Sequence, residues 1–254
     1  MDEDIKFKEI PREKKKRRRK HYLMRFLIVL LVVIVAVGFV LSPAFDIRHV
    51  EVTGNHYYTE EEIINMSGVK LNENLLLHAQ QDEIREALLK DPYFTDVVVT
   101  RKLPSTLCID VTERRQIAAV KYGDGYVVIS EDGTVLRTTD FDPLLTVLTG
   151  LTLSKIKIGE PVQAVESRTL EKTLGMVSVM DEGDLYFKRI EMEGIYINAY
   201  IYDTLIVTGT PEQMRKSIED GNLQKVVNKL YKDGTTRGTI SLGDHNYISF
   251  SPAF

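Results

Sequence analysis

Five histidines and one cysteine are the side chains in this sequence best suited to metal binding or nucleophilic catalysis. They are His21, His49, His56, His78, His245 and Cys108. No two histidines share a metal-ligand spacing, and the sequence supplies no base beside the cysteine. The chain has no GKS or GxGxxG motif, and Gly123-Asp124-Gly125 indicates a turn rather than a phosphate loop. We therefore expect no metal, no cofactor and no catalytic residues, and we predict that the protein is not an enzyme.

A long apolar segment determines the predicted location of the rest of the chain. Residues 22–41 read YLMRFLIVLLVVIVAVGFVL, and Lys14–Lys20 are seven consecutive basic residues. About 20 mostly apolar residues suffice to cross a bilayer, and Arg25 near one end can extend to the headgroups. Positive charge beside a span stays on the cytoplasmic side and attracts anionic lipids. We predict a cell-membrane protein of the single-pass type II, with residues 1–21 as a basic cytoplasmic tail and the remainder outside.

A cleaved secretory signal is the alternative interpretation of this segment, since Ala36-Val37-Gly38 offers small residues near its end. A signal peptide has a short basic region and an apolar core of about 7 to 15 residues. Here a long tail precedes a longer apolar core, which favours an anchor.

The balance of basic and acidic residues changes at the end of this segment. Through Leu41 there are 11 basic and 5 acidic residues, and beyond it 22 basic and 32 acidic residues. The acidic external part argues against nucleic acid as a partner and against charge-driven docking on anionic wall polymers. A single cysteine permits no intramolecular disulfide, so the external domains depend on their own cores.

The first external block, residues 45–114, predicts a small α+β unit. IRHVEVT indicates a strand, and Thr59 with Glu62 forms a capping-box pattern for a helix that ends at Gly68. A second helix is predicted over Gln81–Lys90, before Asp91-Pro92. The strings TDVVVTRKL and TLCIDVTE then indicate two strands joined by a turn, with Leu107, Ile109 and Val111 facing inward. The order strand, helix, helix, strand, strand places two helices on one face of a three-stranded sheet.

These residues carry a resemblance to a known family. The string PYFTDVVVTRKLPSTLCIDVTERR, with VEVTGNHYYTEEEI upstream, resembles the POTRA domain of the bacterial cell-division proteins FtsQ and DivIB. In that family a short basic cytoplasmic tail and one span precede the POTRA domain, as they do here.

The second external block, residues 115–250, predicts a mostly antiparallel β domain with helices. YVVI and TVL, flanked by glycine turns, indicate a hairpin, and a helix is predicted from Ser167 to about Met180. In the stretch from Ile195 to Tyr202 tyrosines alternate with isoleucines. We expect Ile195, Ile197 and Ile201 to form the row facing the core, while the tyrosine row is sheet surface or an interface. Thr210-Pro211-Glu212-Gln213 begins another helix, which Gly221 bends or breaks.

The end of the chain also resembles this family. Strand residues at Ile240 and at Tyr247–Phe250 enclose the loop Gly243–Asn246, and Pro252 begins a short tail, residues 251–254. Ser241 stands where the family commonly has aspartate, which leaves the register of the last strand open.

The resemblance implies a non-enzymatic scaffold of the divisome at the septum. Members of the family join the small bitopic proteins FtsL and FtsB or DivIC and help to control septal peptidoglycan synthesis. The C-terminal strands and the preceding helix carry the principal contact in the family, by adding a strand to a sheet edge. Transferred by motif, the partner-binding residues are Lys229, Leu230, Tyr231, Tyr247, Ile248, Ser249 and Phe250.

Two other classes of function stay open from the sequence. A POTRA-containing component of spore or envelope assembly would have the same fold, because a fold alone does not define the function. An anchored extracellular cell-wall enzyme would need a positioned acid, base or metal, and only a mechanism that uses carboxylates alone is compatible with the residues present. Partner identity distinguishes the first class from division, and loss of wall cleavage on changing external carboxylates would distinguish the second.

Overall fold

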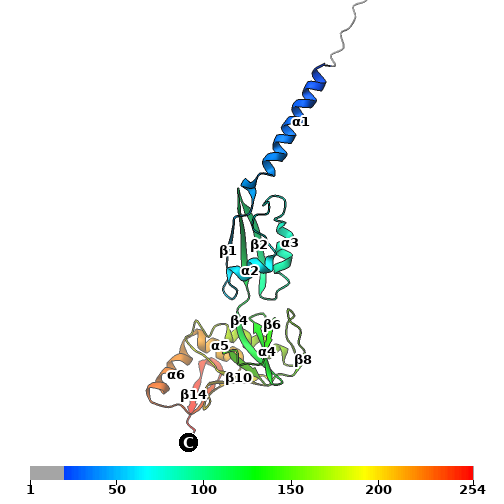
Figure 1. Ribbon diagram of the computed structural model, residues 1–254. Helices are drawn as coiled ribbons and strands as arrows, with labels where there is room; N and C mark the ends of the chain where they lie inside the picture. Colours follow the sequence, from blue (N-terminus) through cyan, green and yellow to red (C-terminus); the bar gives the residue numbers. More distant parts are fainter. Residues whose placement is uncertain (1–19, 254) are drawn as a thin grey trace, which may run out of the picture. The chain divides into compact units, whose positions relative to one another are not determined.

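The computed structural model describes residues 20–253, so most of the predicted basic tail lies outside the described residues. The described chain forms two compact units (Figure 1). The first contains residues 20–49, 70–79 and 101–107, and the second contains residues 50–69, 80–100 and 108–253.

The first unit begins with helix α1, Lys20–Val40. Its stretch Tyr22–Val40 has a mean hydropathy of 3.0 and no buried residue, so its length and composition fit a membrane span. A short 3₁₀ helix, η1 (Pro43–Phe45), follows α1. The Asn74 side chain donates a hydrogen bond to the Val40 carbonyl oxygen at 2.7 Å, which attaches segment 70–79 to the end of α1.

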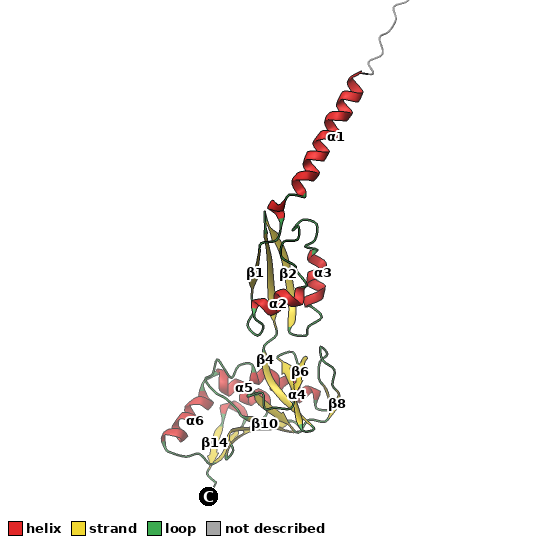
Figure 2. Ribbon diagram, viewed as in Figure 1, coloured by secondary structure: helices red, strands yellow, loops and turns green. Residues whose placement is uncertain are grey.

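A three-stranded sheet has the order β1–β3–β2. Its strands are β1 (His49–Thr53), β2 (Phe94–Lys102) and β3 (Thr106–Glu113), and the helices between β1 and β2 are α2 (Glu60–Ser67) and α3 (Gln81–Leu88). Figure 2 shows both helices on the same side of the strands. The predicted order of strand, helix, helix, strand, strand is therefore confirmed.

Local sequence signals explain the bounds of these helices. Thr59 accepts a hydrogen bond from the backbone N–H of Glu62, and the Glu62 side chain accepts one from the Thr59 backbone, so the predicted capping box is present. Gly68 ends α2 with φ of 70°, a left-handed conformation that favours glycine. Helix α3 ends at Leu88, two residues earlier than the predicted Lys90.

The alternation in β3 has the predicted result. Leu107, Ile109 and Val111 are buried, whereas Asp110 is exposed and Cys108 is half-buried. The inward row belongs to the core that α2 and α3 cover through Ile63, Ile84 and Leu88.

A nine-stranded sheet dominates residues 115–253. Its order is β14–β13–β12–β11–β10–β7–β4–β5–β6, and five of its eight pairings are antiparallel. The strands are β4 (Gln116–Tyr122), β5 (Gly125–Ser130), β6 (Val135–Thr139), β7 (Thr146–Thr149), β10 (Arg189–Glu193), β11 (Tyr196–Tyr202), β12 (Leu205–Gly209), β13 (Gly238–Leu242) and β14 (Ile248–Ser251). Strands β8 (Leu153–Lys155) and β9 (Gln163–Ala164) form a separate small sheet. The α+β fold class is confirmed, and three pairings in the large sheet are parallel.

Three helices contribute to the core of this sheet. They are α4 (Ser167–Val177), α5 (Pro211–Glu219) and α6 (Asn222–Lys232), and their buried side chains pack with Phe187 and the inward residues of the strands. Thr210 and Gln213 form the predicted capping box of α5. Gly221, with φ of 67°, separates α5 from α6, as its position in the sequence indicated.

The prediction for the Tyr and Ile rows was wrong at one residue. Ile197 is fully buried, but Ile195 is 68% exposed because it follows Gly194 in the turn before β11. Tyr196 and Tyr202 are exposed, as expected for the outward row. The end of the chain forms two antiparallel strands in which Ile240 pairs with Phe250, and Tyr247 lies just before β14.

Candidate functional site: a free strand edge

Strand β14 occupies one edge of the nine-stranded sheet. It pairs only with β13 among the described strands, in the register Thr239 with Ser251, Ile240 with Phe250, and Leu242 with Ile248. An edge strand presents unpaired peptide groups, and another extended chain can pair with them.

One hydrogen bond indicates which peptide groups lie on the free side. The Gly243 N–H donates to the Tyr247 carbonyl oxygen at 2.9 Å, so this oxygen faces the β13 side of the hairpin. Peptide groups alternate in direction along a strand, and those of Ile248 and Phe250 therefore point away from β13. A partner strand would find its backbone donors and acceptors at these two residues.

The side chains of β14 have two different environments. Ile248 and Phe250 are half-buried and pack against the hydrophobic core beneath the helices. Ser249 is directed to the opposite face of the strand, because successive side chains alternate. Tyr247, at the start of the edge, is 65% exposed. The edge thus offers an apolar row on the helix side and a hydroxyl on the other.

Gly238 permits the close packing of the last aromatic side chain. A Cβ atom at this position would lie 2.6 Å from Cε2 of Phe250 and 2.6 Å from the Ser251 carbonyl oxygen, and its φ is 138°. Glycine within a strand often marks such a close approach. The sequence alone does not indicate this requirement, because Phe250 and Ser251 are distant from Gly238 along the chain.

Two side-chain hydrogen bonds fix the turn between β13 and β14. This turn contains the 3₁₀ helix η2, Asp244–Asn246. The Gln213 amide donates to Asp244 Oδ1 at 3.0 Å, and the Asn246 amide donates to Asp220 Oδ2 at 3.1 Å. Both bonds join the turn to α5 or its end, so the helix determines where the edge begins.

The three predicted residues on α6 differ in exposure. Leu230 is 9% exposed and belongs to the same core that Ile248 and Phe250 pack against. Lys229 and Tyr231 are exposed on the helix surface. The four residues Tyr247–Phe250 are contiguous at the edge of the sheet. Leu230 is instead buried in the core against which Ile248 and Phe250 pack.

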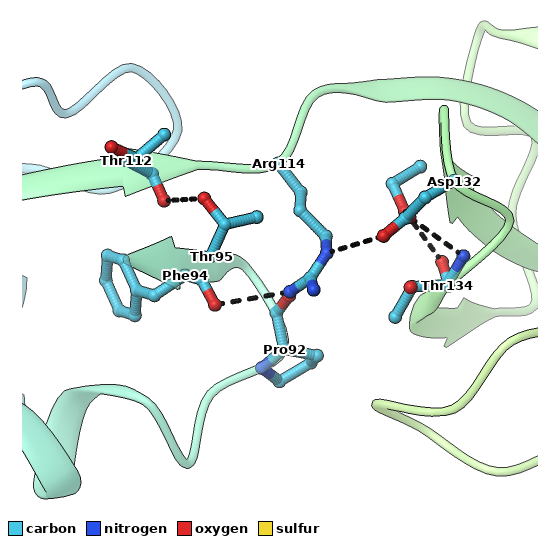
Figure 3. A network of polar contacts seen from close by, with 8 residues as sticks. Pro92, Phe94, Thr95, Thr112, Arg114, Asp132 and Thr134 are labelled. Atoms are coloured by element: carbon cyan, nitrogen blue, oxygen red, sulfur yellow. Dashed lines mark hydrogen bonds and ion pairs between the residues drawn. The ribbon is translucent and has the colours of Figure 1, made fainter. Parts of the chain in front are cut away.

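A second polar feature lies within the larger compact unit, where Arg114 follows β3. Its Nη1 donates to the carbonyl oxygens of Pro92 at 2.7 Å and Phe94 at 3.2 Å, and its Nε lies 3.3 Å from Asp132 Oδ2 (Figure 3). Asp132 also accepts hydrogen bonds from the Ser130 hydroxyl and the Thr134 N–H. Burial acts to raise the pKa of Asp132, but these hydrogen bonds and Arg114 outweigh it and hold the pKa below its usual value.

The stability contribution of Asp132 is expected to depend on pH. Because its pKa is lower in the folded state, the contribution is present above the unfolded pKa of about 4 and is lost as pH falls through the folded value. Asp132→Asn is therefore expected to lower the denaturant midpoint of the detergent-solubilised chain at pH 7, and this effect is expected to become smaller as the pH falls below about 4. Asp124→Asn, in the turn at the other end of β5, serves as the control. An effect of Asp132→Asn that is the same at pH 7 and pH 3 would contradict the prediction.

The potential metal and nucleophile residues lie apart in the described part of the chain. His49, His56 and His78 are exposed, while the side chains of His21 and His245 lie outside the described set. No group of three or more His, Cys, Asp or Glu side chains among the described residues could hold a metal ion. The Cys108 sulfur lies 3.5 Å from a carboxylate oxygen of Glu51.

Comparison with known proteins gives results for both parts of the external region. The family model described as "POTRA domain, FtsQ-type" matches residues 45–114. The chain is 29% identical to the cell division protein DivIB of Clostridium acetobutylicum, over 77% of this chain and 82% of the relative. It is 27% identical to DivIB of Clostridium botulinum strain Hall, over 81% of this chain and 80% of the relative.

A solved structure also matches, with 19% identity and a TM-score of 0.30, over 42% of this chain and 87% of the other. It is the major extracytoplasmic domain of the trans isomer of DivIB from Geobacillus stearothermophilus.

The fold and the family match define a protein with an FtsQ-type POTRA domain behind one apolar helix. The match covers most of the length of these two relatives, and both are cell-division proteins. The chain thus contains an FtsQ-type POTRA domain and is similar along most of its length to DivIB cell-division proteins, and this similarity supports a role in cell division.

Proposed function

We propose that this protein is a non-enzymatic, single-pass scaffold of the division machinery that binds its partners by strand addition to β14. The observation that carries the proposal is the position of β14 at the edge of the large sheet, with its partner-facing side open among the described strands. Main-chain hydrogen bonds to Ile248 and Phe250 would provide affinity, and the flanking side chains would provide specificity.

The proposed partners are small bitopic division proteins of the FtsL and FtsB/DivIC type. This assignment rests on the family resemblance, and the chemistry of the edge agrees with an extended peptide segment as the ligand. Tyr247, Ile248, Ser249 and Phe250 form the contact, with Lys229 and Tyr231 on α6 as outer contacts and Leu230 supporting them from the core. Through these partners the protein would help to regulate septal peptidoglycan synthesis.

The proposed location is the cell membrane at the septum. The basic block Lys14–Lys20 precedes the apolar stretch Tyr22–Val40, and the positive-inside rule then assigns the N-terminus to the cytoplasm. The span and the basic tail interact with lipid, and the POTRA and β domains face outward. The acidic external region disfavours nucleic acid, and no small-molecule substrate is proposed.

A photo-crosslinker at Tyr247 in living cells tests the proposal. The expected result is capture of small single-pass proteins with a coiled coil next to the membrane, identified by mass spectrometry. Tyr122 is the matched control, since it is 56% exposed at the end of β4 and away from the edge in sequence and sheet order. Capture of sporulation or wall-synthesis proteins at Tyr247 instead would remove the division-scaffold assignment and favour an envelope-assembly component.

A further inference from the structure

Three leucines in the same compact unit as α1 have exposed side chains. Leu71 is 56% exposed, Leu77 is 50% exposed and Leu103 is 61% exposed. They come from segments 70–79 and 101–107 of that unit. Single exposed leucines are common on protein surfaces, but apolar side chains gathered in one region mark contact with a membrane or with another protein. We refer to these three residues as the leucine patch.

Backbone hydrogen bonds attach both segments to the chain that leaves α1. The Ile47 N–H donates to the Glu73 carbonyl oxygen at 2.8 Å, and the Asn72 N–H donates to the Ile47 carbonyl oxygen at 2.9 Å. The Arg48 N–H donates to the Ser105 carbonyl oxygen, also at 2.9 Å. Both segments are therefore held beside residues that follow the end of α1 closely in the chain.

The end of α1 indicates the depth of this region in the bilayer. The stretch Tyr22–Val40 has 19 residues, which make about 28 Å of helix, against about 30 Å for the hydrocarbon core. Val40 therefore lies close to the boundary between hydrocarbon and headgroups. The Asn74 side chain donates its hydrogen bond to the Val40 carbonyl oxygen at 2.7 Å. Part of segment 70–79 is thus at the level of the headgroup layer, which is roughly 5–8 Å thick on each side.

The charge of this region differs from that of the external chain as a whole. Segments 42–49, 70–79 and 101–107 contain four basic and two acidic residues, whereas the chain beyond Leu41 contains 22 basic and 32 acidic residues. The four basic residues are all exposed, and they are Arg48, Lys70, Arg101 and Lys102. Basic side chains close to a membrane surface are attracted by anionic headgroups.

We propose that this end of the POTRA domain contacts the outer leaflet of the membrane, with the leucine patch in the interface and the basic residues on anionic phospholipid headgroups. Apolar side chains next to basic ones are the combination with which peripheral elements bind membrane surfaces. The contact gives the domain a second attachment besides the span and restricts its tilt relative to the membrane. This inference rests on the proposed span, because the span brings the leucine patch to the bilayer.

Single tryptophans test the contact in the full-length chain, because the sequence contains no tryptophan. Leu71→Trp and Leu103→Trp are each reconstituted in vesicles of equal parts phosphatidylglycerol and phosphatidylcholine that also carry lipids spin-labelled near the headgroup. The spin label is expected to quench both tryptophans several-fold more strongly than that of Val98→Trp. Val98 is the matched control because it is 49% exposed on β2 and about 16 Å from Leu103 along the chain direction of that strand.

The outcomes of this experiment separate the inference from the proposed span. Quenching of Leu71→Trp and Leu103→Trp no stronger than that of Val98→Trp would overturn the inference. A shift of their emission to shorter wavelength without quenching by lipid would assign the leucine patch to a second copy of the chain, and would also overturn it. Alkaline carbonate extraction of the same vesicles tests the span. Protein that resists extraction retains the span even where the inference fails, and protein that is extracted means that both fail.

Lys70→Gln tests the contribution of the headgroup charge. The Lys70 side chain is 77% exposed, and its Nζ lies 3.9 Å from Glu73 Oε1. In the Leu71→Trp chain, this substitution is expected to reduce the equilibrium between contact and no contact roughly fivefold in vesicles that contain phosphatidylglycerol. Lys90→Gln, at an exposed residue of the other compact unit, is expected to have no effect. Equal quenching of Leu71→Trp in phosphatidylglycerol-containing and pure phosphatidylcholine vesicles would overturn the assignment to anionic headgroups.

Discussion

Phe250→Ser is expected to abolish recruitment of the small division proteins while the protein remains in the membrane. Phe250 is half-buried, packs against the core and has its peptide group on the free side of β14. Removing its ring takes away both the apolar surface for the partner and the packing that holds the strand against the sheet. Full burial of such a side chain contributes about 1.5–3 kcal/mol, so the affinity is expected to fall by roughly 10- to 100-fold.

Phe250→Leu provides the matched control for this substitution, since it retains an apolar side chain in the same strand. The measurement is partner capture from Tyr247 in each variant, together with the amount of full-length protein in the membrane fraction. Recruitment is expected to persist in the leucine variant and to disappear in the serine variant. Normal recruitment by Phe250→Ser would show that β14 is not the partner-binding edge.

Features that depend on a few neighbouring residues could be predicted from the sequence. The capping boxes at Thr59 and Thr210 involve a side chain and a backbone group three residues apart, so their pattern appears directly in the chain. The break at Gly221 is also local, since glycine reaches the left-handed conformation easily. The inward row of β3 follows from a period of two residues.

Features that depend on residues far apart in the chain could not be predicted in this way. The parallel pairings of β7 with β4 and β10 bring together strands separated by other elements, and no local pattern records them. The exposure of Ile195 depends on where the turn at Gly194 ends rather than on the alternation of β11. Burial of Leu230 depends on how α6 packs, so the helix residues of the predicted contact divide into core and surface.

The edge itself combines both kinds of information. The sequence indicated that the last strands lie near Ile240 and at 247–250, and the family resemblance pointed to them as the contact. Neither the sequence nor the resemblance indicated the register, the pocket that α5 and the β13–β14 turn form beside Ile248 or the need for glycine at position 238. These features arise only when β13 pairs with β14 and α5 contacts the turn.

Gly238→Ala is expected to displace the end of β14 and to prevent partner recruitment as effectively as the loss of Phe250. The new Cβ would lie 2.6 Å from both the Phe250 ring and the Ser251 carbonyl oxygen, distances that real Cβ atoms do not show. Since one contact is to backbone, rotation of the phenylalanine ring alone cannot relieve it, and β14 must move away from β13. The expected loss of recruitment is again roughly 10-fold or more, because the displaced strand no longer presents its peptide groups in register.

Gly234→Ala separates this effect from the cost of the backbone conformation. Gly234 has φ of 69°, so alanine there also carries left-handed strain, of order 1 kcal/mol, but its Cβ would meet no atom within 4 Å. Capture from Tyr247 is expected to survive Gly234→Ala and to be lost in Gly238→Ala, with both proteins present in the membrane at comparable levels. Equal capture by the two variants would mean that partners bind without the packing of Phe250 against Gly238, and that the contact lies elsewhere on the β domain.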